Sequence, residues 1–179
     1  MSTCRVRLIL WFVLVIFSVF GGLLLDVALK TAAFPLLIRL VGLVGVVGAH
    51  FPLKRTGKLL RLRGEAEQWG CTSCLITDDI YRCVRHPHHL GVGIFMTSAG
   101  LLIGHRWSFL LITLTQWAWV LGFLFLVEEP ELRDKFGQAY TAYSRRTSIL
   151  FPDLRCVVSV LRRPLRESRL EKLGEAFDQ

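Results

Sequence analysis

The sequence is poor in acidic residues: it has 14 Asp and Glu against 22 Lys and Arg, which gives a formal net charge of +8. Charged residues make up only 20% of the chain and hydrophobic residues 53%, and the mean hydropathy is positive. Soluble domains contain roughly 45–50% apolar residues even when glycine is counted. The composition therefore argues against a soluble globular protein and favours a membrane protein.

Other sequence features are also missing, and each absence argues against a class of protein. The chain has no internal repeat and no low-complexity segment, and its length suits one domain. Its five cysteines, an odd number, do not suggest a secreted disulfide framework. A basic chain can bind nucleic acid, but with long apolar runs the excess of Lys and Arg is explained more simply by membrane orientation and anionic lipid headgroups. We expect membrane lipids as partners and no nucleic acid.

Four apolar segments predict membrane spans, at residues 8–29, about 35–51, 89–104 (rather short) and 108–127. The first segment is longer than the apolar core of a signal peptide and lacks a small-x-small cleavage site, so we expect a retained span. Asp26 and Arg39 lie at similar depth on the first two segments, and we expect them to pair. Close approach of those two helices is predicted by their glycines, which are Gly21, Gly22, Gly42, Gly45 and Gly48.

The sequence predicts an all-α fold, a polytopic membrane helical bundle of about four spans, with the last two forming a hairpin and with interfacial C-terminal helices. Residues 1–52 form two N-terminal transmembrane helices. Residues 53–154 form a core with a cytoplasmic loop, the hairpin 88–127 and an amphipathic helix 130–146. Residues 155–179 form a basic cytoplasmic tail. We expect residues 54–63 to continue the second helix, and Pro130 to end the hairpin and begin the amphipathic helix.

Lys and Arg counts predict the orientation. With an even number of spans, both termini lie on the side that carries Arg5, Arg7, the basic stretch 50–85 and every basic residue after Glu128. The opposite side holds only Lys30, Arg39 and Arg106. The positive-inside rule therefore places both termini and the polar clusters described next in the cytoplasm.

Two polar clusters flank the hairpin. The first is the stretch 77–91, TDDIYRCVRHPHHLG, in which Arg85 can grip a carboxylate or phosphate and His86 can move a proton near neutral pH. Pro87 begins a helix, and Gly91 removes a side chain one turn later. The second cluster, Glu128 and Glu129, suits an ammonium, a sulfonium or ribose hydroxyls. A zwitterionic ligand would bridge the two clusters.

These stretches resemble the two signatures of the isoprenylcysteine carboxyl methyltransferase-like and phospholipid methyltransferase-like integral membrane enzymes. The first stretch is similar to T-G-x-Y-x-x-x-R-H-P-x-Y-x-G. The later stretch, EEPELRDKFGQAYTAYSRRTSILFP, is similar to E-E-x-x-L-x-x-x-F-G-x-x-Y-x-x-Y followed by a proline. The resemblance covers roughly residues 50–154. Two positions depart from it: His89 replaces a tyrosine, and Asp79 replaces a glycine.

The resemblance implies a methyltransferase that uses S-adenosylmethionine and a lipophilic or lipid-attached acceptor entering from the bilayer between the last two spans. It implies a catalytic role for Arg85 and His86, near the methionine carboxylate or the acceptor. The cofactor-binding residues that it implies, with no metal ion, are His86, Pro87, His89, Gly91, Glu128 and Glu129.

Three alternatives stay open. Cys71, Cys74, Cys83 and His86 have the C-x2-C-x8-C-x2-H spacing of a structural zinc site, which would occupy His86. A non-catalytic scaffold or interaction protein would tolerate the changes at Asp79 and His89. A membrane reductase would share the hairpin, although the sequence has no nicotinamide-binding signature. The sequence does not identify the methyl acceptor or the oligomeric state.

Overall fold

The structure, a computed structural model, describes residues 3–63 and 74–163. Within these ranges its regular secondary structure is helical, with connecting turns and an isolated backbone bridge between Ala33 and His105. The elements are α1 (Thr3–Ala28), α2 (Leu36–Arg63), the 3-10 turn η1 (Asp79–Arg82), α3 (Pro87–Ile103), α4 (Arg106–Phe123), the π-helical turn η2 (Leu124–Glu128), α5 (Glu129–Ser144) and α6 (Leu154–Leu161). The predicted all-α class is confirmed.

Length and hydropathy identify three helical stretches that can cross a membrane: Arg5–Ala28, Leu36–Arg61 and Arg106–Ser144. Helix α3 is apolar but shorter, as its sequence predicted. Large apolar side chains on α1 and α2 face outward, with Leu24 70% and Val44 72% exposed. Such surfaces suit lipid rather than water, and the chain is a polytopic membrane bundle.

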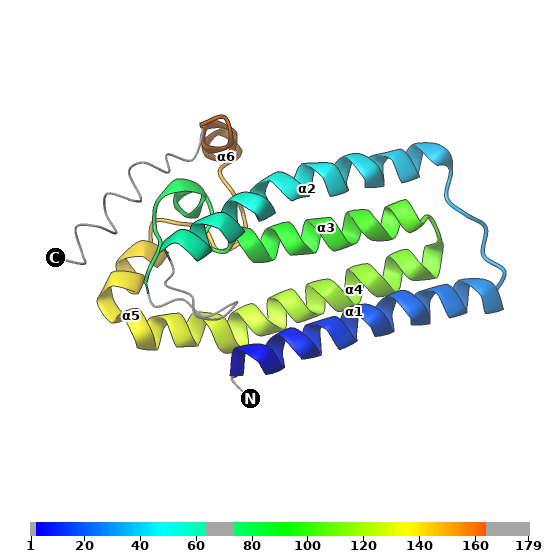
Figure 1. Cartoon of the computed structure of the whole chain (residues 1–179), viewed down its shortest axis with the longest axis horizontal. Coiled ribbons are helices and arrows are strands. Elements are labelled where there is room, and N and C mark those ends of the chain that lie inside the picture. The colour runs from blue at the N-terminus through cyan, green and yellow to red at the C-terminus, as the bar shows by residue number, and fades with distance from the viewer. Residues whose placement is uncertain (1–2, 64–73, 164–179) are drawn as a thin grey trace.

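The bundle is ordered α2, α3, α4, α1 (Figure 1). Helix α1 packs on α4 and α2 packs on α3, so the predicted close contact between the first two helices is wrong. Three of the five glycines serve these other interfaces: a Cβ on Gly22 would lie 2.5 Å from Cα of Ser108, one on Gly42 2.6 Å from the backbone nitrogen of Leu102, and one on Gly45 would overlap the hydroxyl of Ser98. A Cβ on Gly21 would make only an ordinary contact at 3.8 Å, and one on Gly48 would meet nothing within 4 Å, so the close-packing role predicted for these two is not found.

The same arrangement separates Asp26 from Arg39, so their predicted pairing is also wrong. The Asp26 carboxylate accepts hydrogen bonds from the backbone N–H groups of Trp107 (3.0 Å) and Ser108 (2.8 Å). It also accepts from the hydroxyls of Thr31 and Ser108. Arg39 donates instead to the carbonyl of Leu102. Asp26 thus caps the positive N-terminal end of α4 from the neighbouring helix.

The amphipathic helix begins where the sequence predicted, because α5 starts at Glu129 with Pro130 in its first turn, but no loop separates it from the hairpin. Helix α4 passes through the π turn η2 into α5, and Pro130 occupies the first turn of α5, where its missing N–H costs no hydrogen bond. The helix bends later, at Gly137, whose φ of 49° is one that glycine adopts readily. Glu128 is the last residue of the π turn, so the wider turn sets the direction of its side chain.

A disulfide joins Cys83, after η1, to Cys156 on α6. The two cysteines belong to a small buried core with Leu59, Ile80 and Val160. This bond contradicts the alternative of a zinc site on the cysteines, because Cys83 is not available as a thiolate; Cys74 is a free, exposed cysteine, and Cys71 lies outside the described residues. Helix α6 forms the start of the basic tail, and residues 164–179 also lie outside the description.

Candidate functional site

The site lies at the end of the bundle where η1, α5 and α6 gather (Figure 1). Backbone hydrogen bonds connect the first polar cluster to the segment after α5. Arg85 N–H donates to the Ser148 carbonyl at 2.8 Å, and His86 N–H donates to the Ile149 carbonyl at 3.3 Å. The two sequence motifs are therefore connected through the main chain as well as through side chains.

The start of the first motif is anchored by two contacts. Asp79, which replaces the family glycine, has a φ of 54°, in the left-handed region that aspartate tolerates better than most residues. Arg55 of α2 holds its carboxylate in a two-pronged contact at 2.7 and 2.8 Å. Tyr143 of α5 donates its hydroxyl to the Tyr81 carbonyl at 2.7 Å. Asp79 therefore adopts a backbone conformation that glycine favours and adds an ion pair with Arg55.

Arg85 connects the two motifs in the interior. Its side chain is 11% exposed and contacts both carboxylate oxygens of Glu129, at 2.9 and 3.0 Å. It also donates to the Ser144 carbonyl at 2.7 Å and to the Thr147 carbonyl at 2.9 Å. A guanidinium matches such a set of planar acceptors. With its donors directed at protein oxygens, Arg85 holds the end of α5 against the start of α3.

Glu129 is the common partner of this buried network. Its oxygen Oε1 lies 2.7 Å from Nε2 of His86 and accepts the Tyr140 hydroxyl at 2.6 Å. Nδ1 of His86 lies 3.4 Å from the other carboxylate, Glu128. Burial lowers the pKa of His86, but the hydrogen bonds and negative charges of the two glutamates outweigh it and leave that pKa above its ordinary value. His86 is therefore held in position from both sides.

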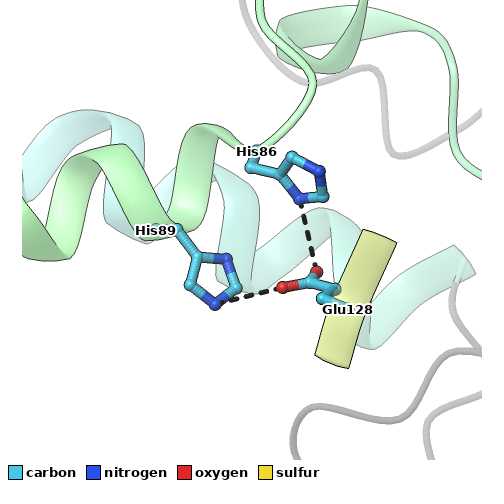
Figure 2. A group of neighbouring side chains, drawn as sticks. All are labelled: His86, His89 and Glu128. Atoms are coloured by element: carbon cyan, nitrogen blue, oxygen red, sulfur yellow. Dashed lines mark ion pairs between the residues drawn. The ribbon is translucent and has the colours of Figure 1, made fainter. Parts of the chain in front are cut away.

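The side chains of Glu128 and His89 point toward each other (Figure 2) and are the more accessible part of the site. Their side chains are 26% and 22% exposed, whereas that of His86 is 3% exposed. His89 Nε2 lies 3.2 Å from Glu128 Oε2 and forms an ion pair with it, although the geometry of this contact is not that of a hydrogen bond. These groups, rather than Arg85 and Glu129, have bonding capacity left for a ligand.

An aromatic stack continues this face into the bundle. The His89 ring stacks on Phe123 at 5.8 Å between centroids, and Phe123 stacks on Trp119 at 5.9 Å. The guanidinium of Arg7 lies 5.4 Å from the Phe123 ring and forms an ion pair with Glu131 of α5. Sequence reasoning missed Arg7 and Phe123, since nothing in the local pattern relates α1 to residues more than 100 positions away.

The structure brings together five of the seven residues singled out from the sequence, which are Arg85, His86, His89, Glu128 and Glu129. Pro87 is buried at the first turn of α3 and starts that helix. At Gly91 a Cβ would lie 2.9 Å from the side chain of Leu53 on α2. The space left by this glycine is thus taken by a neighbouring helix, which gives Gly91 a packing role.

Comparison with known proteins supports the resemblance of the motifs. A sequence model of the family described as phospholipid methyltransferase matches residues 31–139, more than half of the chain. The chain belongs to the phospholipid methyltransferase family. A relative, the protein-S-isoprenylcysteine O-methyltransferase of Schizosaccharomyces pombe, is 35% identical over 72 residues. That match covers 40% of this chain and 30% of the relative. No solved structure matches the chain.

Proposed function

We propose that this member of the phospholipid methyltransferase family transfers a methyl group from S-adenosylmethionine to a lipid-soluble or lipid-attached acceptor. The acceptor would be a prenylcysteine-like carboxylate or a phospholipid-like amine. The observation that carries the proposal is the direct contact between the two motif clusters, Arg85–His86 and Glu128–Glu129, at one end of a membrane bundle. The orientation of this end toward the cytoplasm stays a prediction from the Lys and Arg counts.

The residues present fit such a cofactor. S-adenosylmethionine supplies an activated methyl group on a positively charged sulfur, together with an adenine ring and an amino acid. Glu128, partly exposed and with one oxygen lacking a hydrogen bond, suits the positive charge. The stack of His89, Phe123 and Trp119 suits an aromatic ring or a cation over its face.

The buried network has a supporting role in this proposal. Arg85 and Glu129 bind each other and the end of α5, so they orient His86 rather than reach a ligand themselves. This modifies the role expected for Arg85, which becomes a positioning residue. Methyl transfer requires in-line approach more than proton transfer, and a rigid support lowers the entropic part of that barrier.

Binding of the cofactor is the direct test. Isothermal titration of the full chain in detergent with S-adenosylmethionine should give a dissociation constant well below about 1 mM, equivalent to more than about 4 kcal/mol. Glu128→Gln should weaken binding at least about tenfold, since it removes the negative charge on the accessible face of the site. The matched control is Glu131→Gln on α5, whose carboxylate is 53% exposed and pairs with Arg7. Binding no tighter than millimolar would refute the proposal.

Turnover distinguishes the acceptors. Labelled S-adenosylmethionine is supplied with phosphatidylethanolamine vesicles or with a farnesylated cysteine, and label is counted in the lipid extract. Label in either acceptor supports the proposal and identifies the acceptor class. Binding of the cofactor with no label in either acceptor or in total membrane lipid would favour the non-catalytic scaffold.

A further inference from the structure

Two histidines and a carboxylate converge on the accessible face of the site. His86, His89 and Glu128 can each offer one ligand atom, and these atoms lie within 4.8 Å of one another; both histidines face the Glu128 carboxylate (Figure 2). We propose that this trio is a binding site for a divalent transition metal ion of the zinc type. The residues that carry it are the family's histidine, the family's glutamate and the histidine that replaces the family's tyrosine.

Local structure explains why the three side chains converge. His86 precedes α3 and His89 lies three positions later, so both project from the same side of its first turn. Glu128 comes from the π turn η2, which rotates it toward them. His86 and His89 therefore form one half of the site and Glu128 the other, with no contribution from an exposed loop.

The distances suit a small ion. Bonds from zinc to nitrogen or oxygen of roughly 2.0–2.1 Å place neighbouring tetrahedral ligands about 3.3 Å apart. His86 Nδ1 to Glu128 Oε1 is 3.4 Å and His89 Nε2 to Glu128 Oε2 is 3.2 Å. The pair of histidine nitrogens, within 4.8 Å, needs only side-chain rotation to close. Three protein ligands leave a fourth position open.

The protein already contains the hydrogen-bond partners that would orient a histidine ligand of such an ion. A histidine ligand usually donates its other ring N–H to a carboxylate, which fixes the tautomer. His86 Nε2 lies 2.7 Å from Glu129 Oε1, and Glu129 is itself held by Arg85 and Tyr140. In the metal-free site, His86 Nδ1 and His89 Nε2 each form an ion pair with an oxygen of Glu128. A metal ion that binds here displaces a proton from this cluster: His86 Nε2 keeps its hydrogen toward Glu129, and the Nδ1 lone pair becomes available as a ligand.

The ligand types select the class of metal. Imidazole with carboxylate favours zinc and its neighbours in the first transition row, whereas Mg²⁺ and Ca²⁺ prefer all-oxygen sites. This set is distinct from the cysteine-based set considered from the sequence, in which Cys83 is unavailable because of its disulfide. If the proposed function holds, zinc and S-adenosylmethionine exclude each other, because Glu128 and His89 serve both; that part rests on the proposed function.

The experiment is a Zn²⁺ titration of the full chain in detergent after chelator treatment, with no methyl donor present. We expect a dissociation constant of about 1 µM or tighter. His89→Tyr and Glu128→Gln should each weaken it at least about 100-fold, since each removes a ligand. The matched control is His88→Ala, the adjacent histidine, whose ring nitrogen Nδ1 lies 3.3 Å from the Thr56 hydroxyl and whose ring meets the His89 ring edge-on without offering a ligand atom to the trio; the affinity of this variant should stay within about threefold.

The titration is repeated in a Cys4→Ser, Cys71→Ser, Cys74→Ser background, which removes the cysteines other than Cys83 and Cys156. In this variant the titration uses Co²⁺ in place of Zn²⁺, because bound Co²⁺ absorbs visible light. The bound ion should keep this absorption and show no charge-transfer band from a thiolate ligand. Zinc binding weaker than about 100 µM, equal losses in His88→Ala and His89→Tyr, or loss of the metal with the thiols would each overturn the site. Equal melting temperatures of His88→Ala and His89→Tyr would show that their difference in zinc affinity comes from the lost ligand and not from a loss of folded protein.

The proposed competition between zinc and S-adenosylmethionine is measured separately, as the affinity for S-adenosylmethionine with and without zinc. Saturating zinc should weaken S-adenosylmethionine binding at least about tenfold, because the shared carboxylate is then neutralised. Unchanged donor binding overturns the shared use of Glu128. Absence of donor binding without zinc counts against the proposed function alone, since the zinc titration is independent of the donor.

Discussion

Replacement of Arg85 by alanine should destabilise the protein strongly, because Arg85 is one half of a buried ion pair. Its side chain is 11% exposed and that of Glu129 is 6% exposed. Removing one partner of such a pair leaves the other charge buried without its counter-ion and costs about 3–5 kcal/mol. His86 and Tyr140 still bind Glu129, which reduces the loss, but the carbonyls of Ser144 and Thr147 lose their donors. We therefore expect about 4 kcal/mol.

Equilibrium unfolding in mixed micelles of increasing denaturing-detergent fraction, followed by tryptophan fluorescence, measures the change. The matched control is Arg133→Ala, because Arg133 also lies near Glu129, at 3.6 Å, but its side chain is 65% exposed. An exposed pair contributes at most about 1 kcal/mol. Similar losses for the two variants, or a loss below about 1 kcal/mol for Arg85→Ala, would refute the assignment of Arg85 as the buried support of the site.

Three further substitutions test other parts of the fold. Asp26→Ala should cost about 2–3 kcal/mol in the same unfolding assay, because the N-terminal N–H groups of α4 lose their acceptor; an unchanged midpoint would contradict the cap. Tyr140→Phe should cost about 1.5–3 kcal/mol, since a buried carboxylate loses a hydrogen bond, and Tyr→Phe at the partly exposed Tyr81 is the comparison. Cys83→Ala opens a disulfide that spans 73 positions, for which chain entropy gives about 4 kcal/mol. Cytoplasmic thiols are kept reduced, so a disulfide that persists in membranes prepared with an alkylating agent would contradict the cytoplasmic orientation.

Sequence alone determined the class of the fold and the composition of the site. Apolar runs long enough to cross a bilayer specify helices, because lipid leaves no other way to satisfy the backbone of a single segment. The spacing of Arg85–His86 and Glu128–Glu129 around one hairpin predicted that they meet, since a hairpin returns the chain to the same membrane face. Both features depend on local pattern and on chain connectivity, which a sequence contains directly.

Only the tertiary structure decided which helices pack together and which polar groups pair. Gly22 and Asp26 both serve α4 rather than α2, since side chains are satisfied by spatial neighbours that may lie 80 positions away. The same reason explains the unexpected Cys83–Cys156 bond. The sequence also did not reveal which residues support the site and which face a ligand. Arg85 and Glu129 use their hydrogen-bonding groups on each other and on neighbouring protein groups, whereas Glu128, in the π turn, faces His89. Whether a polar group has all its hydrogen bonds depends on its neighbours in three dimensions, which a sequence motif does not specify.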